Sequence, residues 1–113
     1  DSGGRVNATG GVSNVSGITA LMFAAQEGHE LVAELLVWGG AEIDQKDCRG
    51  CTALQLAAIF DHPAALHCLL RAGADTKPRT VAGHTALQLA KEKGYTECVR
   101  ALEEHAAAEV AAE

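Results

Sequence analysis

The chain repeats itself with a period of 33 residues, and this repeat constrains the fold more than any other feature. At that offset Gly17, Gly50 and Gly83 coincide, and each is followed after one residue by Thr-Ala-Leu. The blocks read GITALMFAAQEGHELVAELLVWGGAEI, GCTALQLAAIFDHPAALHCLLRAGADT and GHTALQLAKEKGYTECVRALEEHAAAE. A period of about 20–50 residues is typical of stacked units, because one short unit cannot bury its apolar side alone. We therefore expect three stacked copies of one unit.

Each block begins with a predicted short helix. Thr52 is a good N-cap residue, because its hydroxyl can accept a backbone N–H that the first turn leaves unpaired. Leu54, Ala57 and Ala58 then recur at positions i, i+3 and i+4, which lie on one face of a helix. Aromatic residues make up only 4% of the chain, so the core must be built from Ala, Leu and Val.

A tight turn and a second helix follow. Gly28 and Gly94 suit the left-handed residue that ends a helix, and Asp61, which tolerates this conformation better than most residues, takes the place in block two. Pro63 stands in the first turn of the second helix, where its missing N–H costs little. The apolar positions expected in the core of the second helices are Val32, Leu35, Leu36, Ala65, Cys68, Leu69, Cys98, Ala101 and Leu102.

These features together resemble the ankyrin repeat. The unit contains T-A-L-x-x-A, then G-H or D-H, then L-L-x-x-G-A-D, where the usual ankyrin motif has T-P-L-H-x-A. The resemblance covers residues 14 to 105 and implies an all-α solenoid of stacked helix-turn-helix units with projecting β-turns. Met22, Gln55 and Gln88 stand where the family usually has His, and Ala replaces Pro at 20, 53 and 86. We expect these changes to weaken a turn-stabilising hydrogen-bond network without changing the fold.

The resemblance divides the chain into repeats and ends. Repeat one is residues 14–46, repeat two is 47–79 and repeat three is 80–105. Lys91 replaces an interior Ala and Glu103 an aliphatic residue, which indicates a capping unit. Residues 106–113 form an Ala/Glu-rich tail that could extend the last helix or fray. Residues 1–13 resemble the closing loop of a preceding repeat plus an insertion, so we expect the natural chain to continue N-terminally with more repeats.

The segment DCRGCTALQLAAIFDHPAALHC has nearly the Cys2His2 spacing of a zinc finger. A helix of about nine residues, roughly 13 Å long, separates Cys48 and Cys51 from His62. Zinc ligands must all lie within about 2.0–2.3 Å of one ion, so His62 and His67 cannot complete this site. A metal or redox sensor based on the Cys pair alone remains a weaker alternative.

The four cysteines are expected to be reduced, because no signal peptide is visible and the cytoplasm or nucleus is the expected location. Cys68 and Cys98 fall on core positions, whereas Cys48 and Cys51 fall on variable turn sites and are expected to react quickly with thiol reagents. Cys51 and His84, one repeat apart, are the only pair that suggests a nucleophile and a base. We interpret them as two variable surface residues.

Composition excludes several functional classes. Nine Lys and Arg against 15 Asp and Glu give a formal charge of −6, which argues against a free-standing nucleic-acid binder. No apolar run is long enough to span a bilayer. The sequence has no P-loop, no paired carboxylates on a shared face and no activated nucleophile, so we expect no catalysis, no cofactor and no metal.

The resemblance implies a domain that binds another protein through its turn tips and concave helix face. Phe60 is the expected anchor, because the aligned residues Glu27 and Lys93 are charged. Arg49 and Arg79 are expected to form a basic patch for an acidic or phosphorylated segment of the partner. The candidate binding residues are Ser16, Ile18, Gln26, Glu27, Lys46, Cys48, Arg49, Cys51, Ile59, Phe60, Arg79, Val81, His84, Glu92 and Lys93.

Two further expectations complete this interpretation. The fragment should be a monomer, and Trp38 should pack against the N-terminal loop rather than bind the partner. The alternative function is a regulatory or substrate-recognition domain of a larger enzyme whose catalytic part lies outside this fragment. The sequence cannot identify the partner, since the same scaffold serves unrelated partners.

Overall fold

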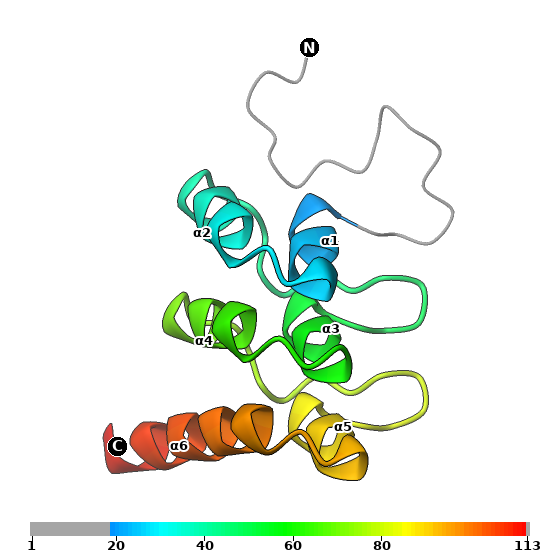
Figure 1. The fold of residues 1–113 in the computed structure, drawn as a ribbon, viewed down its shortest axis with the longest axis vertical. Coiled ribbons are helices and arrows are strands. Elements are labelled where there is room, and N and C mark those ends of the chain that lie inside the picture. Colours follow the sequence, from blue (N-terminus) through cyan, green and yellow to red (C-terminus); the bar gives the residue numbers. More distant parts are fainter. Residues whose placement is uncertain (1–18, 113) are drawn as a thin grey trace.

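The computed structural model describes the backbone of residues 19–112, and every regular element in that part of the chain is a helix (Figure 1). The helices are α1 (Ala20–Glu27), α2 (Glu30–Trp38), α3 (Ala53–Ile59), α4 (Pro63–Arg71), α5 (Ala86–Lys93) and α6 (Thr96–Ala112). The expected all-α architecture of helix pairs is therefore confirmed. None of the described helices is long and apolar enough to cross a membrane.

The first helix of every pair begins as the sequence predicted. Thr19, Thr52 and Thr85 are N-caps in extended conformation, and each hydroxyl accepts the N–H of the residue three positions later. The side chain of that later residue accepts the N–H of the threonine in return. This reciprocal capping box satisfies two backbone donors that the helix leaves unpaired.

The ends of these helices also follow the prediction. Gly28 has φ 76° and Gly94 has φ 73°, both left-handed, and Asp61 has φ 60°. Asp61 is the only non-glycine residue with positive φ among the described residues. Pro63 occupies the first turn of α4, as expected.

The pairs stack in two layers (Figure 1). One layer contains α1, α3 and α5, and the other contains α2, α4 and α6. Leu21, Leu54, Leu66 and Leu69 are buried between these layers together with many alanines. Because alanine lets helix backbones approach closely, the core is thin and each pair packs mainly against its neighbours.

The outer side of the last helix pair, α5 and α6, carries charged residues. Lys91 and Glu103 are both more than half exposed, and their Nζ and Oε2 atoms lie 3.6 Å apart. They replace the buried Ala58 and Leu70 of the preceding pair. The polar outer side expected of a capping unit is therefore present, and α6 continues as a helix through Ala112.

The first pair departs from the prediction in one respect. Val32 and Leu35 were expected in the core, yet Val32 is 48% exposed and Leu35 is 71% exposed. They lie on the outermost helix pair, so no helix of the described chain covers their face. Trp38 is 84% exposed, and the loop that it was predicted to contact lies outside the described residues.

Candidate protein-binding surface

Two turns project beside the first helices, one before α3 and one before α5 (Figure 1). The N–H of Asp47 donates to the carbonyl of Cys51 at 2.9 Å, and the N–H of Thr80 donates to the carbonyl of His84 at 2.9 Å. The two turns are joined directly, because the Val81 N–H donates to the Arg49 carbonyl at 3.0 Å. Both turns therefore belong to one continuous edge of the molecule.

Glycine is required at this junction. Gly50 has φ 78°, a left-handed conformation that side chains other than glycine rarely adopt. A Cβ atom added there would lie 3.1 Å from the backbone nitrogen of Val81. The close approach of the two turns thus depends on Gly50.

Asp47 holds the first turn in shape. Its side chain is fully buried, and its Oδ1 accepts the N–H groups of Arg49 and Cys51, both at 2.9 Å. Its Oδ2 lies 3.2 Å from Nη2 of Arg49, whose side chain remains 60% exposed. The hydrogen bond to Asp47 raises the pKa of Arg49. This role of Asp47 was not predicted from the sequence, although Asp is a common turn residue.

The carboxylate of Asp47 is buried and paired with Arg49, so it is not among the charged side chains that the turns expose. In residues 45–51 and 77–84 every exposed charged side chain is a cation, namely Lys46, Arg49, Lys77 and Arg79. The whole chain carries a formal charge of −6, so this edge is locally basic on an acidic protein.

Cys51 is a correction to the predicted surface. It is 5% exposed and belongs to the buried core, so its thiol is not available to a partner or to a rapid thiol reagent. The reason is its place at the base of the turn, directly before the N-cap Thr52, where the side chain packs inward. Burial raises the pKa of the Cys51 thiol. Cys48, at the tip, is exposed as expected.

Gln55 corrects a second prediction. It was expected to weaken the hydrogen-bond network that stabilises the turns, but it adds hydrogen bonds to that network. Its Nε2 donates to the carbonyls of Pro78 at 2.8 Å and His84 at 3.3 Å, while its Oε1 accepts the Thr52 N–H at 2.7 Å. The side chain is buried at 1% exposure. A glutamine amide thus supplies donors that reach the following turn.

In the third repeat, the turn before α5 and the C-terminal end of α5 lie on one surface. His84 lies at the base of the second turn, and its Nε2 is 3.2 Å from Oε2 of Glu92 in the last turn of α5. The aligned end of α3 carries Ile59 and Phe60. Phe60 is 45% exposed, whereas Ile59 is partly buried against the core.

The comparison with known families agrees with this geometry. A family model described as ankyrin repeats in three copies matches residues 5–80 and 21–113. The chain belongs to the ankyrin-repeat family. No curated protein was found to match the sequence.

Ankyrin repeats generally mediate protein–protein interactions, and the family is typically not enzymatic. The remaining predicted contact residues of these repeats lie at or near the surface. The exposed ones are Glu27, Lys46, Cys48, Arg49, Phe60, Arg79, Val81, Glu92 and Lys93, and Gln26, Ile59 and His84 are partly exposed. Ser16 and Ile18 lie outside the described residues.

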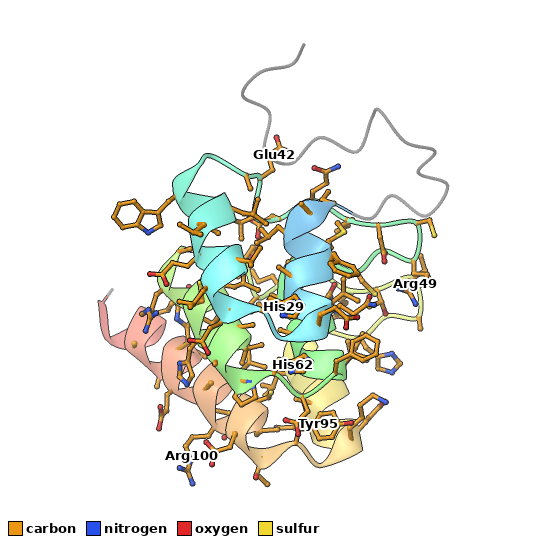
Figure 2. The ribbon with its side chains drawn as sticks, turned by 45° about the horizontal axis from the view of Figure 1, so that its top comes forward. His29, Glu42, Arg49, His62, Tyr95 and Arg100 are labelled. Atoms are coloured by element: carbon orange, nitrogen blue, oxygen red, sulfur yellow. The ribbon has the colours of Figure 1, made fainter. Side chains whose placement is uncertain are left out.

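The histidine of the apparent zinc pattern has a packing role in the ankyrin stack. His62 lies between His29 and Tyr95, the aligned residues of the neighbouring repeats (Figure 2). A Cβ atom added to Gly28 would lie 2.6 Å from Nδ1 of His62, so the ring packs directly against this glycine. Within the described residues, no group of three or more His, Cys, Asp or Glu side chains could hold a metal ion.

Proposed function

We propose that this ankyrin-repeat domain is a scaffold or adaptor module that binds a partner protein through the basic turn tips and the exposed end of α3. We name this surface the binding strip and define its centre by Lys46, Arg49, Phe60, Arg79 and Val81. The observation that carries the proposal is the combination of exposed cations with exposed apolar side chains in the two turns and at the end of α3. The remaining exposed contact residues form its margin.

Two apolar side chains can serve as anchors in the binding strip. Phe60 is 45% exposed and Val81 is 81% exposed. Phe60 is the C-cap residue of α3, and Val81 lies in the turn before α5. A surface that contacts water alone is not expected to carry Phe and Val at these positions. Aromatic residues beside arginines are typical interface anchors.

Charge supports an acidic or phosphorylated partner segment. Arg49 is oriented by the buried carboxylate of Asp47 while more than half of its side chain remains exposed. An arginine held in this way loses less conformational freedom on binding a carboxylate or phosphate. Charges at the rim of an interface mainly accelerate association and make it dependent on salt.

We also propose that the domain works as a monomer inside the cell, in the cytoplasm or nucleus. The exposed Cys48 thiol is free, which is typical of proteins in reducing compartments. The proposed activity is binding without catalysis, cofactor or metal.

The proposal is tested with a protein captured from cell extract on the immobilised chain and then titrated against purified variants. Phe60→Ala should weaken binding by on the order of 2 kcal/mol if Phe60 is an anchor. Arg79→Glu should slow association and change its salt dependence, without disturbing the Asp47–Arg49 pair. His67→Ala, on the exposed side of α4, is the matched control and should leave the affinity unchanged. If His67→Ala weakens binding and the other two variants do not, the partner binds the opposite face and the proposal is refuted.

A further inference from the structure

The turns before α3 and α5 share a backbone conformation but carry different side chains at one aligned position. Asp47 and Thr80 are 33 residues apart, so they are equivalent in the repeat. The N–H of Asp47 donates to the Cys51 carbonyl and the N–H of Thr80 donates to the His84 carbonyl, each at 2.9 Å. A turn glycine then donates to the carbonyl of Asp47 at 3.0 Å or of Thr80 at 2.8 Å. At this position the two turns therefore differ in the side chain and not in the backbone.

Asp47 stabilises its turn with a carboxylate, which Thr80 lacks. Oδ1 of Asp47 accepts the N–H groups two and four residues later, both at 2.9 Å. Oγ1 of Thr80 accepts the N–H four residues later, at the longer distance of 3.3 Å. Within the described residues, no acceptor pairs with the N–H two residues later, which belongs to the exposed Ala82. The third turn therefore lacks one hydrogen bond and the negative charge that Asp47 supplies to the second.

Thr80 is partly exposed and lies among the cations of both turns. Lys77 and Arg79 precede it by three residues and one residue, and both are exposed. A Cβ atom added to Gly50 of the other turn would lie 3.4 Å from the Thr80 Cα. The Arg49 carbonyl accepts the N–H of the residue that follows Thr80, at 3.0 Å. An anionic group attached to Thr80 would therefore be stabilised by cations from two turns.

The other described threonines do not combine these features. Three of them use their hydroxyls as helix N-caps, namely Thr19, Thr52 and Thr85. Thr76 directly follows Asp75, and Thr96 begins α6 with a single cation, Lys93, among the three residues before it. Kinases choose their substrates partly by the pattern of charge around the hydroxyl. Thr80 has the most basic pattern of these hydroxyls.

We propose that Thr80 is a phosphorylation site, at which the phosphate takes the structural place of the Asp47 carboxylate and reduces the positive charge of the turns. The phosphate comes from ATP, and the enzyme is a protein kinase that prefers basic residues before the acceptor. The Thr80 hydroxyl oxygen attacks the γ-phosphorus, the bond from that phosphorus to the bridging oxygen breaks, and ADP leaves. The hydroxyl proton passes to the catalytic aspartate of the kinase.

The phosphate supplies what the third turn lacks. It adds a charge of about −1.5 to −2 and three acceptor oxygens. These oxygens lie further from the Cα atom than the carboxylate oxygens of an aspartate, which suits the more exposed position of Thr80. They are placed to accept the N–H groups of Ala82 and His84, and charge-assisted hydrogen bonds of this kind are roughly twice as strong as neutral ones. Phosphorylation should therefore stabilise the turn.

The same phosphate regulates the binding strip, a consequence that rests on the proposed function. It lies next to Arg79, one of the cations at the centre of the strip. An acidic or phosphorylated segment of the partner would meet a like charge there, which disfavours binding. Phosphorylation of Thr80 should therefore release the partner.

The first test labels the folded chain with ATP and a kinase that prefers basic residues, and maps the phosphate by mass spectrometry. The label should appear on Thr80, disappear in Thr80→Val and persist in Thr76→Val and Thr96→Val. The site is refuted if Thr96 is labelled in place of Thr80. It is also refuted if the kinase labels Thr80 in a peptide of residues 74–84 but not in the folded chain.

The second test measures the structural role by urea unfolding of the chain with phosphothreonine incorporated at position 80. This chain should unfold at a higher urea concentration than the unmodified chain, and Thr80→Asp should shift the midpoint in the same direction. Thr76→Asp is the matched control, because it adds the same charge four residues earlier, outside the turn. No shift in the phosphorylated chain, or equal shifts in the two aspartate variants, would show that the phosphate does not replace the Asp47 carboxylate.

The third test uses the partner captured on the immobilised chain. Phosphorylation of Thr80 should weaken its binding about tenfold, and Thr80→Val treated with the same kinase and ATP should keep full affinity. An unchanged affinity for a partner that Arg79→Glu weakens would contradict the regulatory role. The first two tests need no partner, so failure to capture one counts against the proposed function and not against phosphorylation of Thr80.

Discussion

Gln55 binds the segment that leads into the next repeat, because its Nε2 donates to the Pro78 carbonyl oxygen at 2.8 Å. The two residues are 23 positions apart in the chain, so this bond fastens the start of α3 to the following turn. The same amide also reaches the His84 carbonyl and the Thr52 N–H. One buried side chain therefore connects the N-terminus of α3, the segment that follows this repeat's helices and the neighbouring repeat.

Replacing Gln55 by Ala should lower the free energy of unfolding by about 2–3 kcal/mol, because buried backbone groups lose their partners. Gln88→Ala is the matched control. Within the described residues the exposed Gln88 makes the capping contacts with Thr85 and no others, so its loss should cost about 0.5–1 kcal/mol. Urea denaturation followed by circular dichroism measures both. Equal losses would mean that the contacts of Gln55 across the joint contribute nothing.

Gly28 and Gly94 should differ sharply in their tolerance of alanine. Both are left-handed, but a Cβ at Gly28 would lie 2.6 Å from Nδ1 of His62, whereas nothing lies within 4 Å of one at Gly94. Gly94→Ala should cost about 1 kcal/mol for backbone strain alone. Gly28→Ala should cost clearly more, as measured by urea midpoint. The double variant Gly28→Ala/His62→Ala should recover that excess.

Asp61→Gly should stabilise the domain by roughly 0.5–1 kcal/mol, because Asp61 has φ 60° and glycine adopts this conformation without strain. The change removes a weak contact in which the Cys98 Sγ lies 3.7 Å from Oδ1 of Asp61. Thermal and urea unfolding provide the measurement. A lowered midpoint would show that this contact outweighs the relief of strain.

Only one of the four thiols should react quickly with a thiol reagent. Cys48 is exposed, whereas Cys51, Cys68 and Cys98 are buried, and burial raises the pKa of each buried thiol. The fast phase in native buffer should therefore correspond to one thiol and disappear in Cys48→Ser. A fast phase of two thiols would mean that the base of the turn opens readily. A chelator should leave both the fast phase and the helical signal unchanged.

Stability should fall as the pH rises above about 9. Burial chiefly, with Asp61 nearby, raises the pKa of Cys98 from 9.0 to about 11. Between these values the unfolded chain releases this proton while the folded chain keeps it, so rising pH favours unfolding. The contribution is complete at lower pH and amounts to on the order of 2–3 kcal/mol. Urea midpoints from about pH 8 to about pH 11 should decline less steeply in Cys98→Ala. An identical decline would assign the effect to other groups.

Much of the architecture could be predicted from local sequence. The threonine caps, the left-handed Asp61 and the Pro63 start of α4 follow from the chemistry of single residues and their immediate neighbours. The charged cap at Lys91 and Glu103 could be recognised because it replaces apolar residues at aligned positions. For the candidate surface, the exposure of Phe60 could be inferred in the same way, from the charged residues aligned with it.

Alignment of repeats failed where the answer depended on contacts between them. Cys51 aligns with variable turn positions, yet the buried carboxylate of Asp47 accepts its N–H and its thiol packs into the core. Gln55 departs from the family motif, but whether it weakens or completes the network depended on carbonyls of the next turn. Leu35 and Cys68 are equivalent in sequence, and only stacking decided that one is exposed and the other buried. The sequence by itself determined the unit and its caps, because these are short-range. The tertiary structure decided burial and exposure, because each face of a repeat depends on what lies next to it.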